Sequence, residues 1–326
     1  MINLATLTPQ PADRLENFPV TFFATGMGLM GTTLAIHAAE KAFGLTDSLS
    51  QVALMASAAL FALVVLGYAL KALIHPQAVA HEWNHPVRIA FFPAASISLL
   101  LFAVALLTDY PELARWVWIA GAALQGVLAL AVIGSWIGHR PFQHGQLTPA
   151  WFIPAVGNVI VPIAGVKLGY SEVSWLFFSG GLVFWIVLLT LVMNRLVFHD
   201  AMPARMVPTL MILVAPPSVA FIAWARLVGE PGAFGHILLS LGYVFALLVL
   251  TQVGKFRRMP FAMSWWALSF PIASLSIASF LYAEVAASPG HRLIGAGLLV
   301  LLLAVVLSLL LRTGLAITRR EICLPE

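Results

Sequence analysis

The chain has 326 residues, of which 61% are hydrophobic and only 9% are charged, and its mean hydropathy is +0.97. A soluble domain carries about 25% charged residues, so this composition excludes an ordinary soluble globular protein. The formal net charge is +4, and we attribute the basic excess to one face of a membrane rather than to nucleic acid binding. Cys323 is the single cysteine, so no disulfide can form within the chain.

Ten apolar stretches follow one another, and each is close to the roughly 20 residues that an α-helix needs to cross a bilayer. They occupy residues 18–39, 48–71, 87–107, 113–137, 150–168, 173–197, 207–227, 234–254, 261–286 and 292–316. The sequence therefore predicts an all-α membrane protein with ten transmembrane helices. We expect one channel domain, 18–316, between a cytoplasmic N-terminal segment, 1–17, and a cytoplasmic C-terminal tail, 317–326.

Prolines distinguish the odd-numbered stretches from the even-numbered ones, which contain none. Six prolines lie inside stretches three, five, seven and nine, namely Pro93, Pro154, Pro162, Pro216, Pro217 and Pro271. The first stretch carries Gly26, Gly28 and Gly31 instead. A proline in a helix interior costs about 3 kcal/mol, and lipid cannot satisfy the freed backbone groups. We therefore expect five helical hairpins, in which kinked inner helices surround a pore and straight outer helices shield it.

The basic residues predict the orientation in the membrane. If both termini share one side, five Lys and Arg residues fall on the opposite side, namely Lys41, Arg115, Lys167, Arg226 and Arg292. The first side then holds the other twelve of the 17, and the positive-inside rule makes it cytoplasmic. We expect a multi-pass protein of the cell inner (plasma) membrane with cytoplasmic N- and C-termini.

Ionisable side chains are absent from the middle of every odd stretch. Proton-coupled transporters place such groups at membrane depth, so their absence favours passive transport through an uncharged pore. Six polar residues of the odd stretches offer weak donors, namely Ser96, Ser98, Asn158, Ser269, Ser274 and Ser276. We expect most of them to stabilise helix contacts or kinks rather than to line the pore.

Residues 26–31 match the glycine-rich dinucleotide fingerprint through Gly26, Gly28 and Gly31. That motif needs a preceding strand and a helix whose N-terminus meets the pyrophosphate. This copy lies inside an apolar stretch. We interpret the glycines as sites of close packing or pore width, and we predict no cofactor.

Residues 81–85 match the zinc-protease signature through His81, Glu82 and His85. The chemistry requires both imidazoles on one helical face, with the glutamate as general base. Pro86 disfavours helical geometry at His85, and the segment lies between two apolar stretches. A membrane zinc metalloprotease is therefore a distant alternative, and we predict neither an enzyme nor a metal site.

Four segments resemble the tellurite-resistance/dicarboxylate-transporter family, which includes bacterial TehA and the plant slow-type anion channels. They are His85-Pro86-Val87-Arg88 with Phe91-Phe92, Thr148-Pro149 with Val156-Gly157-Asn158, Ala215-Pro216-Pro217-Ser218-Val219-Ala220, and Trp265-Trp266-Ala267-Leu268-Ser269-Phe270-Pro271. The resemblance runs through all ten stretches. One segment departs from it, because Thr21 and Ala24 replace two glycines that are common in the first pore helix of the family.

The resemblance implies a homotrimer in which each protomer has its own pore, with Phe270 as the gate before the kink at Pro271. It also implies that small anions pass, and a basic cytoplasmic mouth is consistent with that preference. The mouth consists of Arg88, Arg140, Lys255, Arg257 and Arg258. We expect passive transport of chloride- or nitrate-type anions. The alternative within the family is a secondary transporter of C4-dicarboxylates or related oxyanions.

Overall fold

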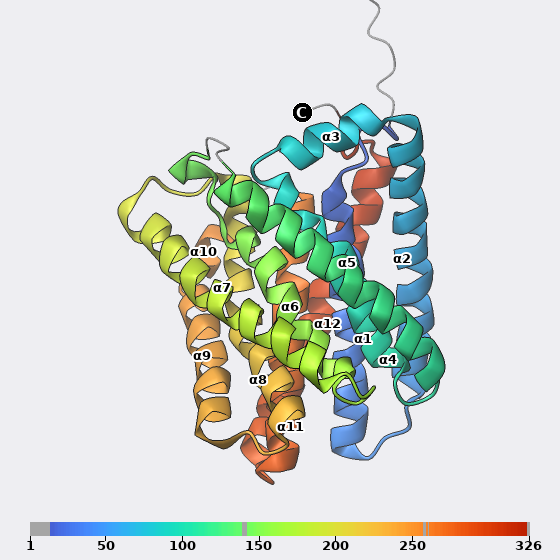
Figure 1. The fold of residues 1–326 in the computed structure, drawn as a ribbon, viewed down its shortest axis with the longest axis vertical. Helices are drawn as coiled ribbons and strands as arrows, with labels where there is room; N and C mark the ends of the chain where they lie inside the picture. Colours follow the sequence, from blue (N-terminus) through green and yellow to red (C-terminus); the bar gives the residue numbers. More distant parts are fainter. Residues whose placement is uncertain (1–13, 139–141, 257–258, 260, 325–326) are drawn as a thin grey trace, which may run out of the picture.

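The computed structural model describes residues 14–138, 142–256, 259 and 261–324. In these residues it is helical, with no strand (Figure 1). Within the described part of the chain, nine helices are long and apolar enough to cross a membrane, and Pro149–Gly165 forms a tenth, shorter apolar helix. The predicted all-α class is therefore confirmed, with the fifth stretch shorter than an ordinary span.

The inner helices come from the odd stretches, and each begins with a 3₁₀ segment. These pairs are η1 (Val20–Phe22) with α1 (Phe23–Phe43), η2 (Arg88–Phe91) with α4 (Pro93–Leu106), η4 (Pro149–Trp151) with α6 (Phe152–Gly165), η5 (Ala204–Val214) with α8 (Ala215–Val228), and η6 (Met263–Leu268) with α11 (Ser269–Val285). Each of α1, α4, α6 and α8 packs against the next, and α11 packs against both α8 and α1. The inner helices thus form a closed ring of five.

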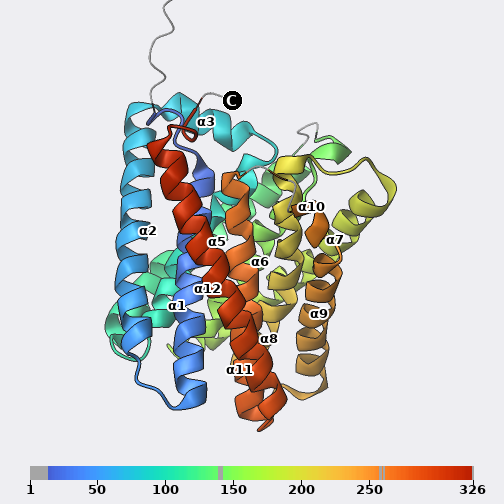
Figure 2. The same cartoon turned by 180° about the vertical axis from the view of Figure 1, so that it is seen from behind.

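The outer helices come from the even stretches and start without a 3₁₀ segment. They are α2 (Ser48–Ile74), α5 (Pro111–Ile137), α7 (Ser171–Phe198), α9 (Gly232–Leu250) and α12 (Pro289–Thr318). The short helices α3 (Pro76–Asn84), η3 (His144–Gln146) and α10 (Val253–Phe256) lie outside the spans. Figure 2 shows α12 lying across α1 and α11, and both pairs are in contact.

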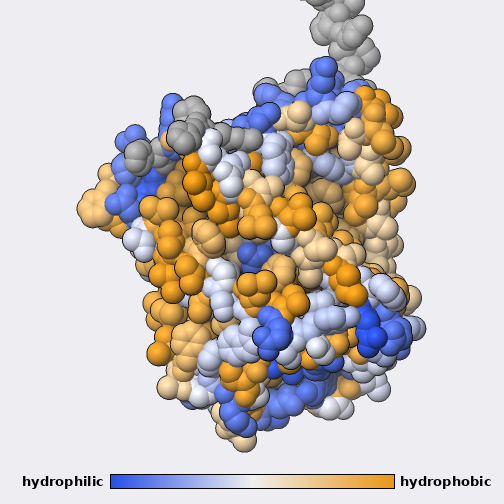
Figure 3. Space-filling model, in the orientation of Figure 1, coloured by the Kyte–Doolittle hydropathy of each residue, from blue (hydrophilic) through white to orange (hydrophobic). Residues whose placement is uncertain are grey.

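Burial separates the two sets of helices. The long inner spans bury 67–83% of their most apolar window, whereas the outer spans bury only 11–39%. The exposed apolar side chains of the outer helices include Met55, Leu63, Leu130, Leu176 and Leu311. Figure 3 shows the resulting apolar band, with hydrophilic residues gathered at both ends of the molecule. This surface matches a bilayer, so the chain is a multi-pass membrane protein, and the expected inner and outer roles are those observed.

The prolines mark the junctions between 3₁₀ and α segments rather than breaks in the middle of α-helices. They occupy the first three positions of their α-helices, with Pro93 in α4, Pro154 in α6, Pro216 and Pro217 in α8, and Pro271 in α11. A first-turn N–H has no partner within its own α-helix, so a proline there breaks no i→i−4 bond of that helix. Of the six prolines singled out from the sequence, Pro162 is the one in the interior of an α-helix, that of α6. That the other five prolines kink their spans stays a prediction.

The glycines of the first stretch lie in one continuous α-helix, and a kink at Gly26 or Gly28 stays a prediction. Helix α1 runs unbroken through both residues. A Cβ added at Gly26 would lie 2.6 Å from the Phe61 ring, and one at Gly28 would lie 2.1 Å from the hydroxyl oxygen of Ser269. Both residues therefore allow close approach of neighbouring helices, which was the packing interpretation of the glycine motif.

Candidate functional site

A small apolar cavity lies inside the ring of inner helices. Its volume is about 20 Å³, which is roughly the space that one water molecule needs. All five inner spans contribute to the lining, which includes Met27, Ile97, Ile160, Pro216 and Phe270. None of the lining residues is ionisable. This constriction therefore presents no fixed charge to a passing solute.

A large vestibule of about 880 Å³ opens on the other side of Phe270. We call this the vestibule end of the molecule, and the opposite end, where α3 lies, the α3 end (Figure 1). Each of the five inner helices contributes residues at or near its C-terminal end to the vestibule, so all five run in the same direction. This arrangement agrees with five parallel hairpins around an axis.

Cationic side chains outnumber carboxylates in the vestibule lining. The cations are Lys41, Lys167, Arg226 and Arg292, and the carboxylates are Asp47 and Glu284. One of the four cations is already paired, because the Lys41 ammonium lies 2.8 Å from a Glu284 carboxylate oxygen. The charge of the lining thus remains positive after both carboxylates are counted.

Two vestibule cations, Lys167 and Arg226, lie near enough for their charges to interact. Partial burial lowers the pKa of Lys167, and the nearby charges of Arg226 and Lys41 lower it further, against a smaller opposing effect of Glu284. The buried Nε of Arg226 has no hydrogen-bond partner among the described residues. The cations at this wall repel one another, and a bound anion would reduce that repulsion.

Phe270 lies between the two cavities and lines both of them. Its side chain is 5% exposed, and it is the second residue of α11, directly after the 3₁₀ segment η6. A Cβ added at Gly31 would lie only 3.0 Å from the Phe270 ring. The absence of a side chain at Gly31 therefore allows the ring to pack closely against α1. The Trp266 indole N–H donates to Thr313 on α12 at 3.0 Å, which fixes η6 to an outer helix.

The polar residues of the inner spans are bonded mainly within and between helices. The Ser96 hydroxyl donates to the Gln125 side-chain oxygen at 2.8 Å, and the Gln125 amide donates to Asn158 at 3.2 Å. The Ser276 hydroxyl bonds the carbonyl of Gly295 on α12 at 2.9 Å. Ser98, Ser269 and Ser274 donate to carbonyls three or four residues earlier in their own chain segment. The expectation of a packing role for most of them is confirmed.

The zinc-protease signature folds into a structural ion pair. The Glu82 carboxylate lies 2.8 Å from the Lys71 ammonium, and both side chains are 2% exposed. It also accepts hydrogen bonds from the Val20 backbone N–H and the Tyr68 hydroxyl. His85 is extended and ends α3, and its Nδ1 accepts the N–H groups of residues 87 and 88. Glu82 thus ties α2 and α3 to the start of the first inner span, and its carboxylate is not free to act as a general base.

The predicted basic mouth is only partly described. Arg140, Arg257 and Arg258 lie outside the described residues. Arg88 begins η2 and Lys255 lies in α10, and neither lines the constriction or the vestibule. Sequence reasoning missed the vestibule cations as a group, although it had assigned each to the side opposite the mouth. The signal that could have found them is their position near the ends of odd stretches or in the adjoining loops.

Comparisons with known proteins agree with this architecture. The family model described as SLAC1, voltage-dependent anion channel, matches residues 17–314. S-type anion channel SLAH3 of Arabidopsis thaliana is 30% identical over 95% of this chain and 51% of its own length. Guard cell S-type anion channel SLAC1 of the same plant is 25% identical, over 85% of this chain and 51% of its own length. The tellurite resistance protein TehA homolog of Haemophilus influenzae is 26% identical, over 79% of each chain.

The fold therefore defines a multi-span helical membrane protein with a central constriction. The chain belongs to the SLAC1 family, because the family model matches residues 17–314, from before the first inner span into the last outer helix. It spans about half the length of the two plant relatives named above. The resemblance stated from the sequence segments is thereby confirmed.

Proposed function

We propose that this protein passes small anions of the chloride or nitrate type passively, through a pore closed by Phe270. The observation that carries the proposal is the position of Phe270 between an uncharged constriction and a basic vestibule. A phenyl ring across an apolar tube excludes water, and an ion cannot cross without water or substitute ligands. The plant relatives named above are anion channels by name, which supports the same proposal.

Two features favour anions over cations. The vestibule has an excess of positive charge, which raises the local concentration of anions at its inner wall. In addition, the first turns of α6, α8 and α11 surround the constriction. Helix N-termini carry positive partial charge, although the 3₁₀ segments that precede these turns reduce the effect below that of a free N-terminus.

The cavity volumes indicate the direction in which the gate opens. A cavity that takes up a benzene ring measures about 150 Å³, whereas the constriction has only about 20 Å³. The vestibule, at about 880 Å³, has ample room. We therefore propose that the ring of Phe270 moves toward the vestibule, at the junction between η6 and α11, when the pore opens.

Liposome flux distinguishes passive from coupled transport. Purified protein in liposomes should release chloride or nitrate down its electrochemical gradient, with no dependence on an imposed proton gradient. The finding that would overturn the passive mechanism is uphill anion uptake driven by a pH gradient. Liposomes without protein and liposomes carrying a denatured sample are the controls for leak.

The second candidate function is secondary transport of C4-dicarboxylates or related oxyanions. The observation in its favour is the pair of neighbouring cations Lys167 and Arg226, which two carboxylates of one substrate could contact together. Malate uptake against its own gradient, driven by pH and lost in Arg226→Gln, would favour this function. A reversal potential for malate that follows its electrochemical gradient would favour the channel.

We further propose an inner-membrane homotrimer whose α3 end faces the cytoplasm. Cys323 tests the orientation, because it lies near Arg14 and Lys71 at the α3 end and is the single cysteine. A membrane-impermeant maleimide should label inside-out vesicles but not intact cells, and labelling should rise with pH because burial raises the pKa of the Cys323 thiol. Labelling of intact cells would reverse the orientation. Native mass spectrometry in detergent tests the trimer.

A further inference from the structure

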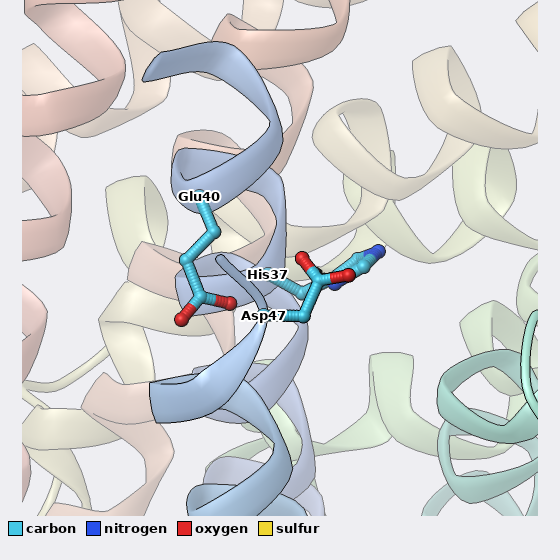
Figure 4. Close-up of side chains that lie close together, drawn as sticks. All are labelled: His37, Glu40 and Asp47. Atoms are coloured by element: carbon cyan, nitrogen blue, oxygen red, sulfur yellow. Dashed lines mark ion pairs between the residues drawn. The ribbon is translucent and has the colours of Figure 1, made fainter. Parts of the chain in front are cut away.

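Three potential metal ligands converge at the vestibule end, away from Phe270. They are His37 and Glu40 near the C-terminal end of α1 and Asp47 at the start of α2 (Figure 4). One ligand atom from each lies within 4.8 Å of the other two. His37 and Asp47 also line the vestibule. No sequence motif predicted this group, because two of its members come from α1 and the third from the turn before α2.

The turn between α1 and α2 brings the three side chains together. Gly44 ends α1 in the left-handed conformation, with φ of 65°, and the next N–H bonds back to the carbonyl of Glu40 at 2.8 Å. Glycine accepts this conformation without a steric penalty, so the chain reverses within a few residues. His37 and Glu40 are three residues apart and share one face of α1, which is the face that Asp47 meets.

The N-terminus of α2 is capped by Glu40 rather than by Asp47, which occupies the N-cap position. Asp47 is the N-cap residue of α2, yet its side chain makes no capping hydrogen bond. Glu40 does the capping instead, because its Oε1 accepts the N–H groups of Leu49 and Ser50 at 2.9 and 3.2 Å. The Asp47 carboxylate is thereby left free to approach His37, and the distance between His37 Nδ1 and Asp47 Oδ1 is 3.5 Å.

A buried carboxylate oxygen at this position lacks a partner. Glu40 is 5% exposed, and its Oε2 has no hydrogen-bond partner among the described residues. A charged oxygen buried without a donor is unfavourable unless a cation or proton reaches it. The adjacent Lys41 is not that cation, because its ammonium pairs with Glu284 on α11.

We propose that His37, Glu40 and Asp47 bind one divalent transition-metal ion of the Zn²⁺ class. Imidazole nitrogen with carboxylate oxygens is a ligand set that suits Zn²⁺ and its neighbours better than Mg²⁺ or Ca²⁺. Ligand atoms at about 2.0–2.1 Å from a tetrahedral ion lie about 3.4 Å from one another. The distance between His37 Nδ1 and Asp47 Oδ1, 3.5 Å, is close to that value. His37 and Asp47 are half-exposed, so an ion reaches the site from the vestibule and water completes its coordination.

Metal titration of the purified full-length protein tests this site without reference to transport. Zn²⁺, followed by calorimetry, should bind at one saturable equivalent per protomer, and Co²⁺ should give a visible absorption band at the same stoichiometry. His37→Ala and Asp47→Asn should weaken binding more than tenfold. His81→Ala is the matched control, because His81 is an exposed histidine at the α3 end and its loss should change nothing.

Glu40→Gln is the most informative variant, because it separates the capping role from the ligand role. The glutamine carbonyl still accepts the two N–H groups of α2, so the fold is retained, while the charge for the metal is lost. We expect Zn²⁺ to raise the unfolding temperature of the unmodified protein and of His81→Ala, but not that of Glu40→Gln or His37→Ala. Equal Zn²⁺ affinity in His37→Ala, in Glu40→Gln and in the unmodified protein, or no saturable binding, would overturn the proposal.

A consequence for transport follows if the proposed anion pathway holds. A bound divalent ion adds positive charge to the vestibule wall, so Zn²⁺ on the vestibule side should increase anion flux at low ionic strength, and should not do so in His37→Ala. Saturable metal binding with no change in flux would leave the metal site in place and count against the vestibule as the anion pathway. The two proposals therefore fail by different measurements.

Discussion

Replacement of Phe270 by alanine should increase anion flux by at least tenfold. Turning the ring out of a favoured rotamer costs about 0.5–1.5 kcal/mol. Giving up about ten carbon contacts, at about 0.1–0.2 kcal/mol each, costs about 1–2 kcal/mol more. The closed position is thus favoured by about 1.5–3.5 kcal/mol, which is roughly 10- to 300-fold. In Phe270→Ala this penalty disappears, and the constriction joins the vestibule.

Planar bilayers or oocytes provide the assay, with current measured at matched amounts of protein. Phe221→Ala is the matched control, because Phe221 is 0% exposed in α8 and lines neither the constriction nor the vestibule. It should lower the unfolding temperature without raising the current. Equal currents from Phe270→Ala and the unmodified protein would refute the gate, and so would a comparable rise in Phe221→Ala.

Three further predictions concern charged groups. A unit charge about 6 Å from a passing anion attracts it by about 0.7 kcal/mol in water. Arg226→Gln should therefore reduce conductance about threefold at low salt. The effect should vanish near 1 M salt, where the Debye length is about 3 Å. The pKa of Lys167 lies below its usual range because of burial and the neighbouring cations, so Lys167 loses its charge as pH rises through that lowered pKa. Anion flux should therefore fall at alkaline pH before ordinary lysines titrate, and Lys167→Arg, measured over the same pH series, should abolish that fall. Glu82→Gln leaves the Lys71 ammonium buried without its carboxylate, which should lower stability by about 3–5 kcal/mol; thermal unfolding in detergent measures the loss, and an unchanged midpoint would contradict a structural role for the pair.

The alternation of inner and outer helices was predictable because the prolines that mark it are visible within each segment of the sequence. Proline at the third position of α11 or the first of α4 is visible in the sequence, and so is the lack of proline in α2 or α7. The nature of the break was not predictable. Whether Pro271 interrupts an α-helix or begins one depends on the 3₁₀ segment before it, and that segment is stabilised by Trp266, which bonds to Thr313 on a distant helix.

The charged constellations could not be predicted because they depend on closure of the ring. Lys41 and Glu284 are 243 residues apart, yet their side chains pair because α1 packs against α11. In the same way, Lys71 and Glu82 pair because α3 packs against α2, whereas the sequence offered Glu82 only as part of a zinc-protease signature. Hydropathy fixes the depth of a side chain in the membrane, but it does not say which neighbour that side chain meets across the ring. The boundaries of the channel domain at 18 and 316 stay a prediction.

The sign of the reversal potential in a salt gradient tests anion selectivity most directly. Phe270→Ala, which should be constitutively open, is placed in a bilayer with a tenfold KCl gradient. The account predicts a reversal potential at the chloride equilibrium value, about 59 mV in magnitude for a univalent ion. A reversal potential of the opposite sign, at the potassium value, would contradict a pathway that selects anions through a basic vestibule.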